Sequence, residues 1–190
     1  MLQKYHIVIT QQALERTFSP AALARIIDAN LHQDRLAGQI GHDEYHFDNN
    51  AFEKSYAYIE EQRTLVLSSL GAGNAPSAWS AFGRLTHTAQ DFYAHTNYID
   101  MWLAQLPTDP RPDPSEADPG DMTFIDSPAL RSGKIYLPLE VLTLFKSLTP
   151  LAMRLLPRDS HAWMNIDSPE KGFQFDYVMQ AAVKRTVIEF

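Results

Sequence analysis

The feature that most constrains this chain is a stretch of 29 residues, from 77 to 105, that is almost free of charge. It contains no proline, and its only Asp, Glu, Lys or Arg residues are Arg84, Asp91 and Asp100. A surface helix of this length would carry roughly seven such residues, since about a quarter of the residues in a typical domain are charged. The stretch is therefore predicted to form one long helix that runs through the middle of the fold.

The rest of the sequence predicts an all-α, multi-helical single domain that spans residues 1–190. A length of 190 residues with 45% hydrophobic content suits one core better than two. Five prolines between 106 and 121 predict an acidic loop without regular structure, and residues 134–136 a short extended piece. Apolar residues at helical spacing predict five further helices. They span 20 to 36, the residues from an Asn49 or Asn50 cap to Gly71, Pro138 to Leu148, the residues between Pro150 and Pro157, and Pro169 to Phe190.

Charge and cysteine content limit the partners and the chemistry. The net charge of -7 disfavours extended nucleic acid as a partner, because it repels phosphate backbones. The chain has no cysteine, so any metal must be held by imidazole and carboxylate groups, which suit zinc, manganese or iron. The first residues lack the shape of a signal peptide, which predicts a cytoplasmic protein, with export without a cleaved signal left open.

Three side chains of the charge-poor stretch lie at a spacing that places them on one helical face. His87, Asp91 and His95 follow one another at intervals of four residues, within an arc of about 80°. The two histidines are about 12 Å apart along the helix, too far to share one ion, so Asp91 would bridge two metals. The alternative to a metal site is that both histidines are hydrogen-bonded core residues and that Asp91 is an ion-pair partner. The metal site is favoured, because a buried unpaired charge is costly.

Asp34 and His46 are candidate ligands from other segments. Asp34 falls on the apolar face of the helix expected at 20 to 36, where a carboxylate is out of place. Its alternative is an ion pair with Arg35 or Arg63. His46 lies between two aromatic residues in a connecting loop, which indicates burial.

Two further histidines give weaker signals. His6 stands in a run of apolar residues, which suits either a metal ligand or a core histidine. His161 is followed by Asp167 six residues later, in a loop. Asp48 is available as a supporting or capping group, whereas His32 is expected to be solvated.

The residues from Phe82 to Tyr98 resemble the signature of the Het-C heterokaryon-incompatibility family. Residues 5–10, 29–35, 41–50 and 161–169 resemble its bacterial members too, so the resemblance covers most of the chain. That family is similar in fold to the zinc-dependent phospholipases C and the fungal single-strand nucleases, which are helical proteins with a trinuclear zinc cluster. The resemblance therefore implies that fold, with a buried central helix.

The resemblance also implies ligands for two or three zinc ions: His6, Asp34, His46, His87, Asp91, His95 and His161. Asp34, His46 and His87 would hold the first zinc together with Asp91. Asp91 would bridge to a second zinc that also takes His6. His95, with a carboxylate or His161, would hold the third.

Two features depart from the family pattern. In secreted relatives a processed N-terminal tryptophan gives its amine and carbonyl to the cluster, whereas here Met1 stands five residues before His6. In those relatives the histidine after the bridging aspartate is six residues on, and here His95 is four residues after Asp91.

Such a site predicts phosphodiester hydrolysis by a metal-bound hydroxide, with Asp34 as the base or orienting group. The resemblance favours phospholipase C activity on a phospholipid or another small phosphodiester, with peripheral membrane contact. One alternative is a single-strand nuclease or nucleotide phosphatase, which would need aromatic side chains to stack on bases. The aromatic residues available for stacking have a spacing more typical of a core: Tyr45, Tyr93, Tyr98 and Trp102. Another alternative is a non-catalytic, metal-stabilised interaction or toxin module.

Overall fold

The charge-poor stretch forms the central helix of the fold, as predicted. The computed structural model describes residues 1–39, 41–143, 145 and 147–190. Helix α6 spans Ala75–His95, begins with the Asn74 side chain accepting a hydrogen bond from the backbone N–H of Ser77, and is buried at every residue from 85 to 95. Its apolar side chains meet those of several other helices, so the core surrounds α6.

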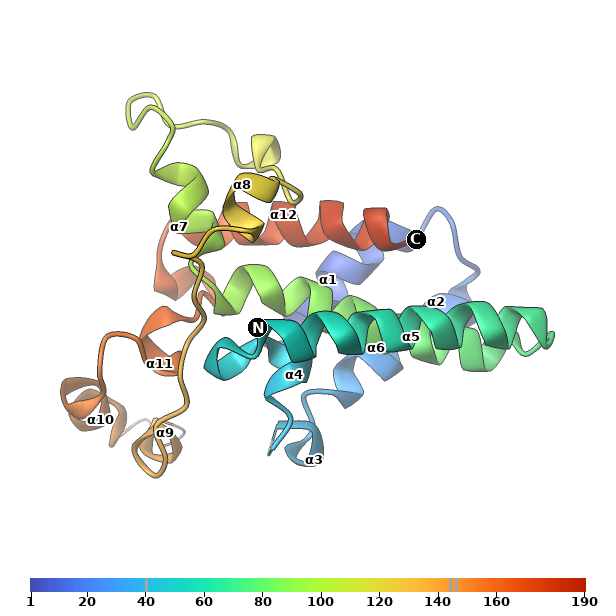
Figure 1. Ribbon diagram of the computed structural model, residues 1–190, viewed down its shortest axis with the longest axis horizontal. Coiled ribbons are helices and arrows are strands. Elements are labelled where there is room, and N and C mark those ends of the chain that lie inside the picture. Colours follow the sequence, from blue (N-terminus) through green and yellow to red (C-terminus); the bar gives the residue numbers. More distant parts are fainter. Residues whose placement is uncertain (40, 144, 146) are drawn as a thin grey trace.

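Four long helices enclose α6 (Figure 1). Helices α2 (Pro20–His32), α5 (Phe52–Gly71) and α12 (Gln174–Glu189) pack directly on it, and α1 (Gln3–Leu14) lies mainly against α12 and α2. The buried side chains that these elements contribute include Ile9, Ile59, Leu85, Ala89, Phe92, Val178, Ala181 and Ala182.

The central helix is shorter than the predicted range of 77 to 105. Thr96 adopts an extended conformation with φ -115° and ψ 166°, which ends α6, and α7 begins at Tyr98 and ends at Leu103. The Thr96 hydroxyl donates to the Phe92 carbonyl and accepts from the Tyr98 N–H. The chain therefore turns at Thr96 without leaving these backbone groups unpaired.

The helix predicted at 20 to 36 also ends early. The backbone N–H groups of Gln33, Asp34 and Arg35 each bond to a carbonyl three residues earlier, which tightens the turn after α2. A short helix, α3, then spans Leu36–Gln39. Asp34 consequently lies in a turn and not on a helical face.

The predicted asparagine cap of α5 is wrong, although the helix ends at Gly71 as expected. Ala51 is the N-cap, while Asn49 and Asn50 both have positive φ angles. The side-chain oxygen of Asn49 accepts a hydrogen bond from the backbone N–H of Ile135, and that of Asn50 accepts one from Ser132, each at 2.7 Å. These bonds tie the loop before α5 to a distant segment.

Short helices and turns make up the second half of the chain. The proline-rich loop is irregular as predicted, apart from one 3-10 turn. The predicted helix from Pro138 to Leu148 is wrong in length, because α9 ends at Leu142, and positions 144 and 146 lie outside the described residues. The predicted piece at 134–136 contributes only a single bridge, between Lys134 and Ser160. The short elements are α4 (Asp43–His46), η1 (Asp48–Asn50), η2 (Pro114–Glu116), α8 (Met122–Ile125), α9 (Leu139–Leu142), α10 (Thr149–Leu155), α11 (His161–Met164) and η3 (Pro169–Lys171).

The prediction of an all-α domain is confirmed. The described residues form twelve α-helices and no strand, in one compact unit. Within the same part of the chain, no helix is both long and apolar enough to cross a membrane.

Candidate metal centre

The predicted stripe of His87, Asp91 and His95 exists on α6 and is fully enclosed by the fold. His87 and Asp91 have no exposed surface, and His95 is 4% exposed. His87 Nε2 lies 3.2 Å from Asp91 Oδ2, whereas His95 Nε2 lies 3.8 Å from Asp91 Oδ1. The two histidines therefore approach opposite oxygens of the same carboxylate.

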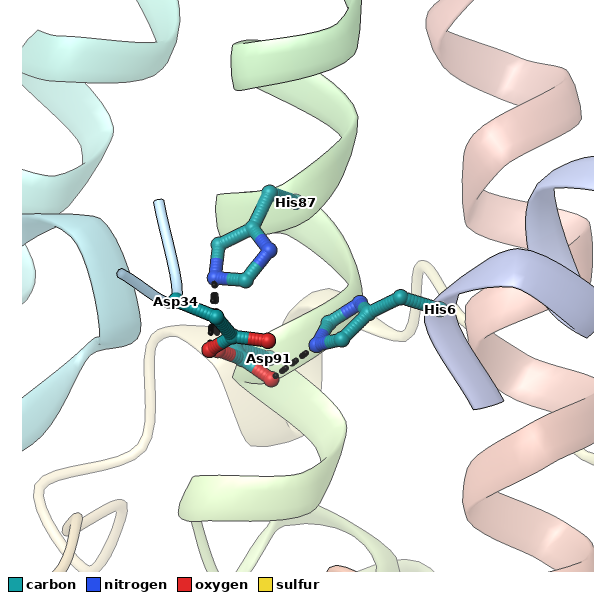
Figure 2. Close-up of side chains that lie close together, drawn as sticks. All are labelled: His6, Asp34, His87 and Asp91. Atoms are coloured by element: carbon teal, nitrogen blue, oxygen red, sulfur yellow. Dashed lines mark ion pairs between the residues drawn. The ribbon is translucent and has the colours of Figure 1, made fainter. Parts of the chain in front are cut away.

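The Oδ2 side of Asp91 gathers His87 of the same helix and residues from two other segments of the sequence. His46, at the end of α4, places Nδ1 2.9 Å from Oδ2. Asp34, in the turn after α2, places Oδ1 3.8 Å from His87 Nε2. With His87 and Asp91, these are the residues that the family resemblance assigns to a first metal, and Figure 2 shows Asp34, His87 and Asp91 pointing toward one another.

The Oδ1 side of Asp91 faces α1 and the start of the chain. His6 of α1 places Nε2 3.2 Å from Oδ1, from the side opposite Asp34 (Figure 2). The amino group of Met1 is buried and lies 2.6 Å from the same oxygen and 2.9 Å from His95 Nε2. Asp91 thus has the placement of a bridging carboxylate, with one oxygen directed to each set of side chains.

A second group lies along the stripe, around His95. His95 Nδ1 is 3.2 Å from Asp48 Oδ1, and His161 Nε2 is 3.7 Å from the same oxygen. His95 Nε2 is also 3.3 Å from Asp167 Oδ1. All seven predicted ligands therefore meet in one region of the molecule.

Sequence reasoning missed two carboxylates of this second group. The local pattern predicts only a supporting role for Asp48, although it lies two residues after His46, and Asp167 stands out only by its spacing from His161. The signal was present in both cases, since each carboxylate follows a candidate histidine closely.

Two sets of these side chains are spaced closely enough to hold a metal ion. In one group, His6, Asp34, His87 and Asp91 each offer a ligand atom, and these atoms lie within 4.8 Å of one another. Another group with the same property consists of Asp48, His95 and His161. Imidazole nitrogen and carboxylate oxygen are ligands that zinc accepts in proteins.

Polar side chains hold two of the imidazoles in fixed orientations. The Oε1 atom of Gln90 lies 2.7 Å from His6 Nδ1, and the Oδ1 atom of Asn30 lies 3.3 Å from His87 Nδ1. Gln90 is itself fixed, because its Nε2 donates to the hydroxyls of Thr10 and Thr186. Each imidazole then donates through Nδ1, which leaves Nε2 as the atom directed at Asp91.

Burial and mutual charge shift the pKa values in the centre. Burial opposes ionisation of Asp91, but the Met1 amino group and the nearby imidazoles hold the pKa of this carboxyl well below its usual value. Burial likewise opposes the charge on Met1, yet Asp167 and Asp91 raise the pKa of its amino group to about 11. Burial lowers the pKa of His87 well below normal. Asp91 is therefore ionised and His87 neutral near pH 7, the states that metal binding requires of these two groups. Burial opposes the charge on His95, but Asp91 and Asp48 raise its pKa to about 10, so a metal at His95 would have to displace a proton.

Two residues of the group that contains Asp91 each have a buried atom that lacks a hydrogen-bond partner within the described part of the chain, His6 Nε2 and Asp34 Oδ2. His6 Nε2 is close to Asp91 Oδ1 but is not aligned for a hydrogen bond. Leaving such atoms unpaired costs about 1–3 kcal/mol each. A divalent cation would remove this cost, so the residues present fit a metal.

The centre is accessible from outside. A pocket of about 340 Å³ is lined by residues of both groups, among them Asp34, His46, His95 and His161. A small ligand can therefore approach these four of the seven predicted ligands.

Two other histidines lie outside the centre. His42 pairs with Glu44 at 2.9 Å, and His32 is exposed, as expected. Tyr93, Tyr98 and Trp102 are buried in the core, which confirms the interpretation of these aromatics as core residues.

Comparison with known proteins gave one family match. The family model described as the VWA7 N-terminal domain matches residues 2–113, which is more than half of the chain. The match includes six of the seven predicted ligands and ends before His161 and Asp167. No curated protein and no solved structure matches the chain.

Proposed function

The chain belongs to the VWA7 N-terminal domain family, and we propose that this member is a zinc-dependent phosphodiester hydrolase of the phospholipase C type. The observation that carries the proposal is the placement of Asp91, whose two oxygens face two different sets of candidate ligands. The relationship to the Het-C family and to zinc-dependent phospholipases C is part of the same proposal. It rests on the motif between Phe82 and Tyr98.

In this proposal the centre holds two or three zinc ions. Asp34, His46 and His87 lie on the Oδ2 side of Asp91, and His6 lies on the Oδ1 side. Another ion would lie among the side chains around His95. Zinc, when bound, supplies Lewis acidity that lowers the pKa of water and neutralises charge that develops on a phosphodiester.

Asp34 is the residue proposed to orient the attacking water. Its Oδ1 faces His87, its Oδ2 is buried without a partner among the described residues, and the residue is one of those that line the pocket. A carboxylate oxygen in this position can accept a hydrogen bond from a water molecule in the pocket. Gln90 and Asn30 support the reaction indirectly, because they keep the imidazoles of His6 and His87 directed at Asp91.

The proposed substrate is a phospholipid or another small phosphodiester. The net charge of -7 disfavours a long nucleic acid. The nuclease alternative is weakened, because three of the four aromatic residues considered for base stacking are core residues. A non-catalytic metal site would have all its coordination positions closed, whereas here a pocket reaches both groups.

The test combines zinc content with hydrolysis. Elemental analysis of protein purified without an affinity-tag metal should find two or three zinc ions per chain, and Asp91→Asn should lose most of them. Release of phosphocholine from phosphatidylcholine should fall in that variant by at least about a hundredfold, equivalent to about 2.7 kcal/mol of barrier. The matched control is His32→Asn, which removes an exposed histidine of α2 and should change neither result.

The outcomes separate the alternatives. If the wild-type protein contains no bound metal, His87, Asp91 and His95 are ordinary core residues, and the hydrolase proposal is wrong. Zinc without hydrolysis of phospholipids or nucleotides would favour the non-catalytic interaction module.

A further inference from the structure

Exposed apolar side chains cluster on residues 137–158, which we call the apolar lobe. Among the described residues, 17 large apolar side chains are exposed, and six of them fall in this segment: Leu137, Val141, Phe145, Leu148, Leu151 and Leu155. They lie on or beside α9 and α10, which contact each other at one end of the helix bundle (Figure 1, lower left). Single exposed apolar residues are ordinary, but a cluster of this kind marks an interaction surface.

The apolar lobe is basic, although the whole chain is acidic. Its sequence holds three basic residues and one acidic residue, in a protein with a net charge of -7. Arg154 and Arg158 are exposed. The one acidic residue, Glu140, is 9% exposed and accepts a hydrogen bond from the backbone of Ala162. The exposed charges described on the lobe are therefore positive, which is complementary to an anionic surface.

The apolar lobe also borders the entrance of the candidate metal centre. Val141 of α9 is 43% exposed and at the same time lines the 340 Å³ pocket that reaches His95 and His161. Ile135, just before the lobe, lines the same pocket. Whatever covers the apolar lobe is thus held next to the pocket mouth.

We propose that the apolar lobe docks on the surface of an anionic phospholipid membrane. The exposed leucines of α10 and Phe145 would enter the interface between head groups and acyl chains, and Arg154 and Arg158 would pair with lipid phosphates. This inference rests on the proposed function, because it explains how a lipid head group would be presented to the pocket. The contact is peripheral and requires no membrane-spanning helix.

The test is co-sedimentation of the zinc-loaded protein with phosphatidylcholine vesicles, prepared with and without phosphatidylserine. Wild-type protein should bind the phosphatidylserine vesicles more tightly. The double variant Leu151→Glu/Leu155→Glu should bind at least about tenfold more weakly, since each leucine loses its apolar contact with lipid. Arg154→Glu should weaken binding to the phosphatidylserine vesicles by at least about fivefold. Leu67→Glu is the matched control, because Leu67 is 65% exposed on α5, outside the lobe, and should bind like wild type.

A second readout separates this inference from the proposed function. Hydrolysis of a water-soluble, short-chain phosphatidylcholine below its micellar concentration needs no membrane, so the double variant should keep wild-type activity on it. Vesicle binding that depends on the lobe, without hydrolysis of either substrate, would support the docking surface and remove the hydrolase. Hydrolysis of the soluble lipid by a wild-type protein that binds no vesicles would overturn the docking surface alone. Equal loss of binding in Leu67→Glu, or wild-type self-association through the lobe without vesicle binding, would also overturn it.

Discussion

At the scale of single residues, Gln90 determines how well the candidate metal centre is organised. Its Oε1 accepts from His6, and its Nε2 donates to Thr10 and Thr186, so one amide links the imidazole to two helices. Gln90 is not one of the proposed ligands, but it is bonded to one of them, His6. It is a positioning residue, since it fixes the tautomer and the direction of His6.

We expect Gln90→Met to lower the affinity for zinc by about 10- to 100-fold, because supporting partners of ligating histidines commonly have effects of this size. Competition titration with a zinc chelator measures the affinity, and thermal unfolding measures the accompanying loss of stability. Thr186→Val is the matched control, because it removes a bond to Gln90 but leaves the bond between Gln90 and His6 in place. Equal zinc affinity in Gln90→Met and wild type would show that the orientation of His6 does not matter for metal binding.

The stripe on α6 could be predicted from the sequence, because helical periodicity alone brings His87, Asp91 and His95 to one face. The other partners of the stripe depend on long-range packing that no local pattern encodes. Asp34 was expected on a helix but reaches the centre from a turn. The amino group of Met1 pairs with Asp91, and α1 packs against α12 and α2; neither arrangement could be read from the first residues.

At the scale of helices, the approach of α2 to α6 depends on one glycine. A Cβ atom at Gly83 would meet the carbonyl oxygen of Ile26 and would lie 2.8 Å from the Cβ of Ala29. Only a residue without a side chain lets the two backbones come this close. Asn30 lies in α2, and the turn that carries Asp34 follows this helix directly, so the same contact places part of the centre.

We therefore expect Gly83→Ala to destabilise the protein by roughly 1–3 kcal/mol, the usual cost of overpacking. Gly71→Ala, at the last residue of α5, is the control, because a Cβ there would meet nothing within 4 Å. It should be neutral or stabilising by about 0.5–1 kcal/mol. Urea unfolding of both variants measures the difference. A Gly83→Ala variant as stable as Gly71→Ala would contradict the close approach of α2 and α6.

The end of α12 is tied to α5 by Glu189. Its side chain is 2% exposed and accepts hydrogen bonds from Arg63 of α5 and Arg185 of α12, each at 2.6 Å. Arg63 also contacts Glu60, whose side chain is 67% exposed. The buried carboxylate therefore contributes more than the exposed one, since solvent screens the outer pair.

Glu189→Gln should cost about 1–3 kcal/mol, because two charged hydrogen bonds weaken at a buried site. Glu60→Gln should stay within about 0.5 kcal/mol of wild type, as is usual for exposed substitutions. Chemical denaturation measures both values. The assignment is wrong if the two variants lose equal stability.

The sequence predicted the long helices better than their ends. A nearly charge-free stretch made the burial of α6 evident, but its break at Thr96 depends on pairing with the distant segment at Ser132. The predicted cap of α5 was wrong for the same reason, since the side chains of Asn49 and Asn50 bond to the segment that contains Ser132. Helix α1 was missed because its buried face mixes His6 and Thr10 with Ile9 and Leu14, which weakens the apolar pattern.

At the scale of the whole molecule, the candidate metal centre joins segments from nearly the full length of the chain. Its side chains come from α1, the turn after α2, α4, α6 and the region around α11. The unfolded chain cannot hold these groups together. Metal binding should therefore stabilise the native state through mass action, by about 2.7 kcal/mol per site when free metal is 100 times its dissociation constant.

Removal of metal with EDTA should accordingly lower the Tm of the wild-type protein. One site of about 2.7 kcal/mol corresponds to a shift of roughly 5–10 °C for a domain of this size, and two independent sites to more. Differential scanning calorimetry with EDTA, followed by addition of excess zinc, measures the loss and its recovery. His32→Asn should behave like wild type, and an EDTA-insensitive wild-type Tm would contradict the link between metal and fold.

The same measurement on Asp91→Asn distinguishes a shared cluster from independent sites. If Asp91 bridges two ions, its loss should remove most of the EDTA-dependent shift, because both ions share its carboxylate. If Asp48, His95 and His161 hold an ion alone, about one site's share of the shift should remain. A full wild-type shift in Asp91→Asn would mean that the stabilising metal lies entirely in this second group, and the bridging role of Asp91 would be wrong.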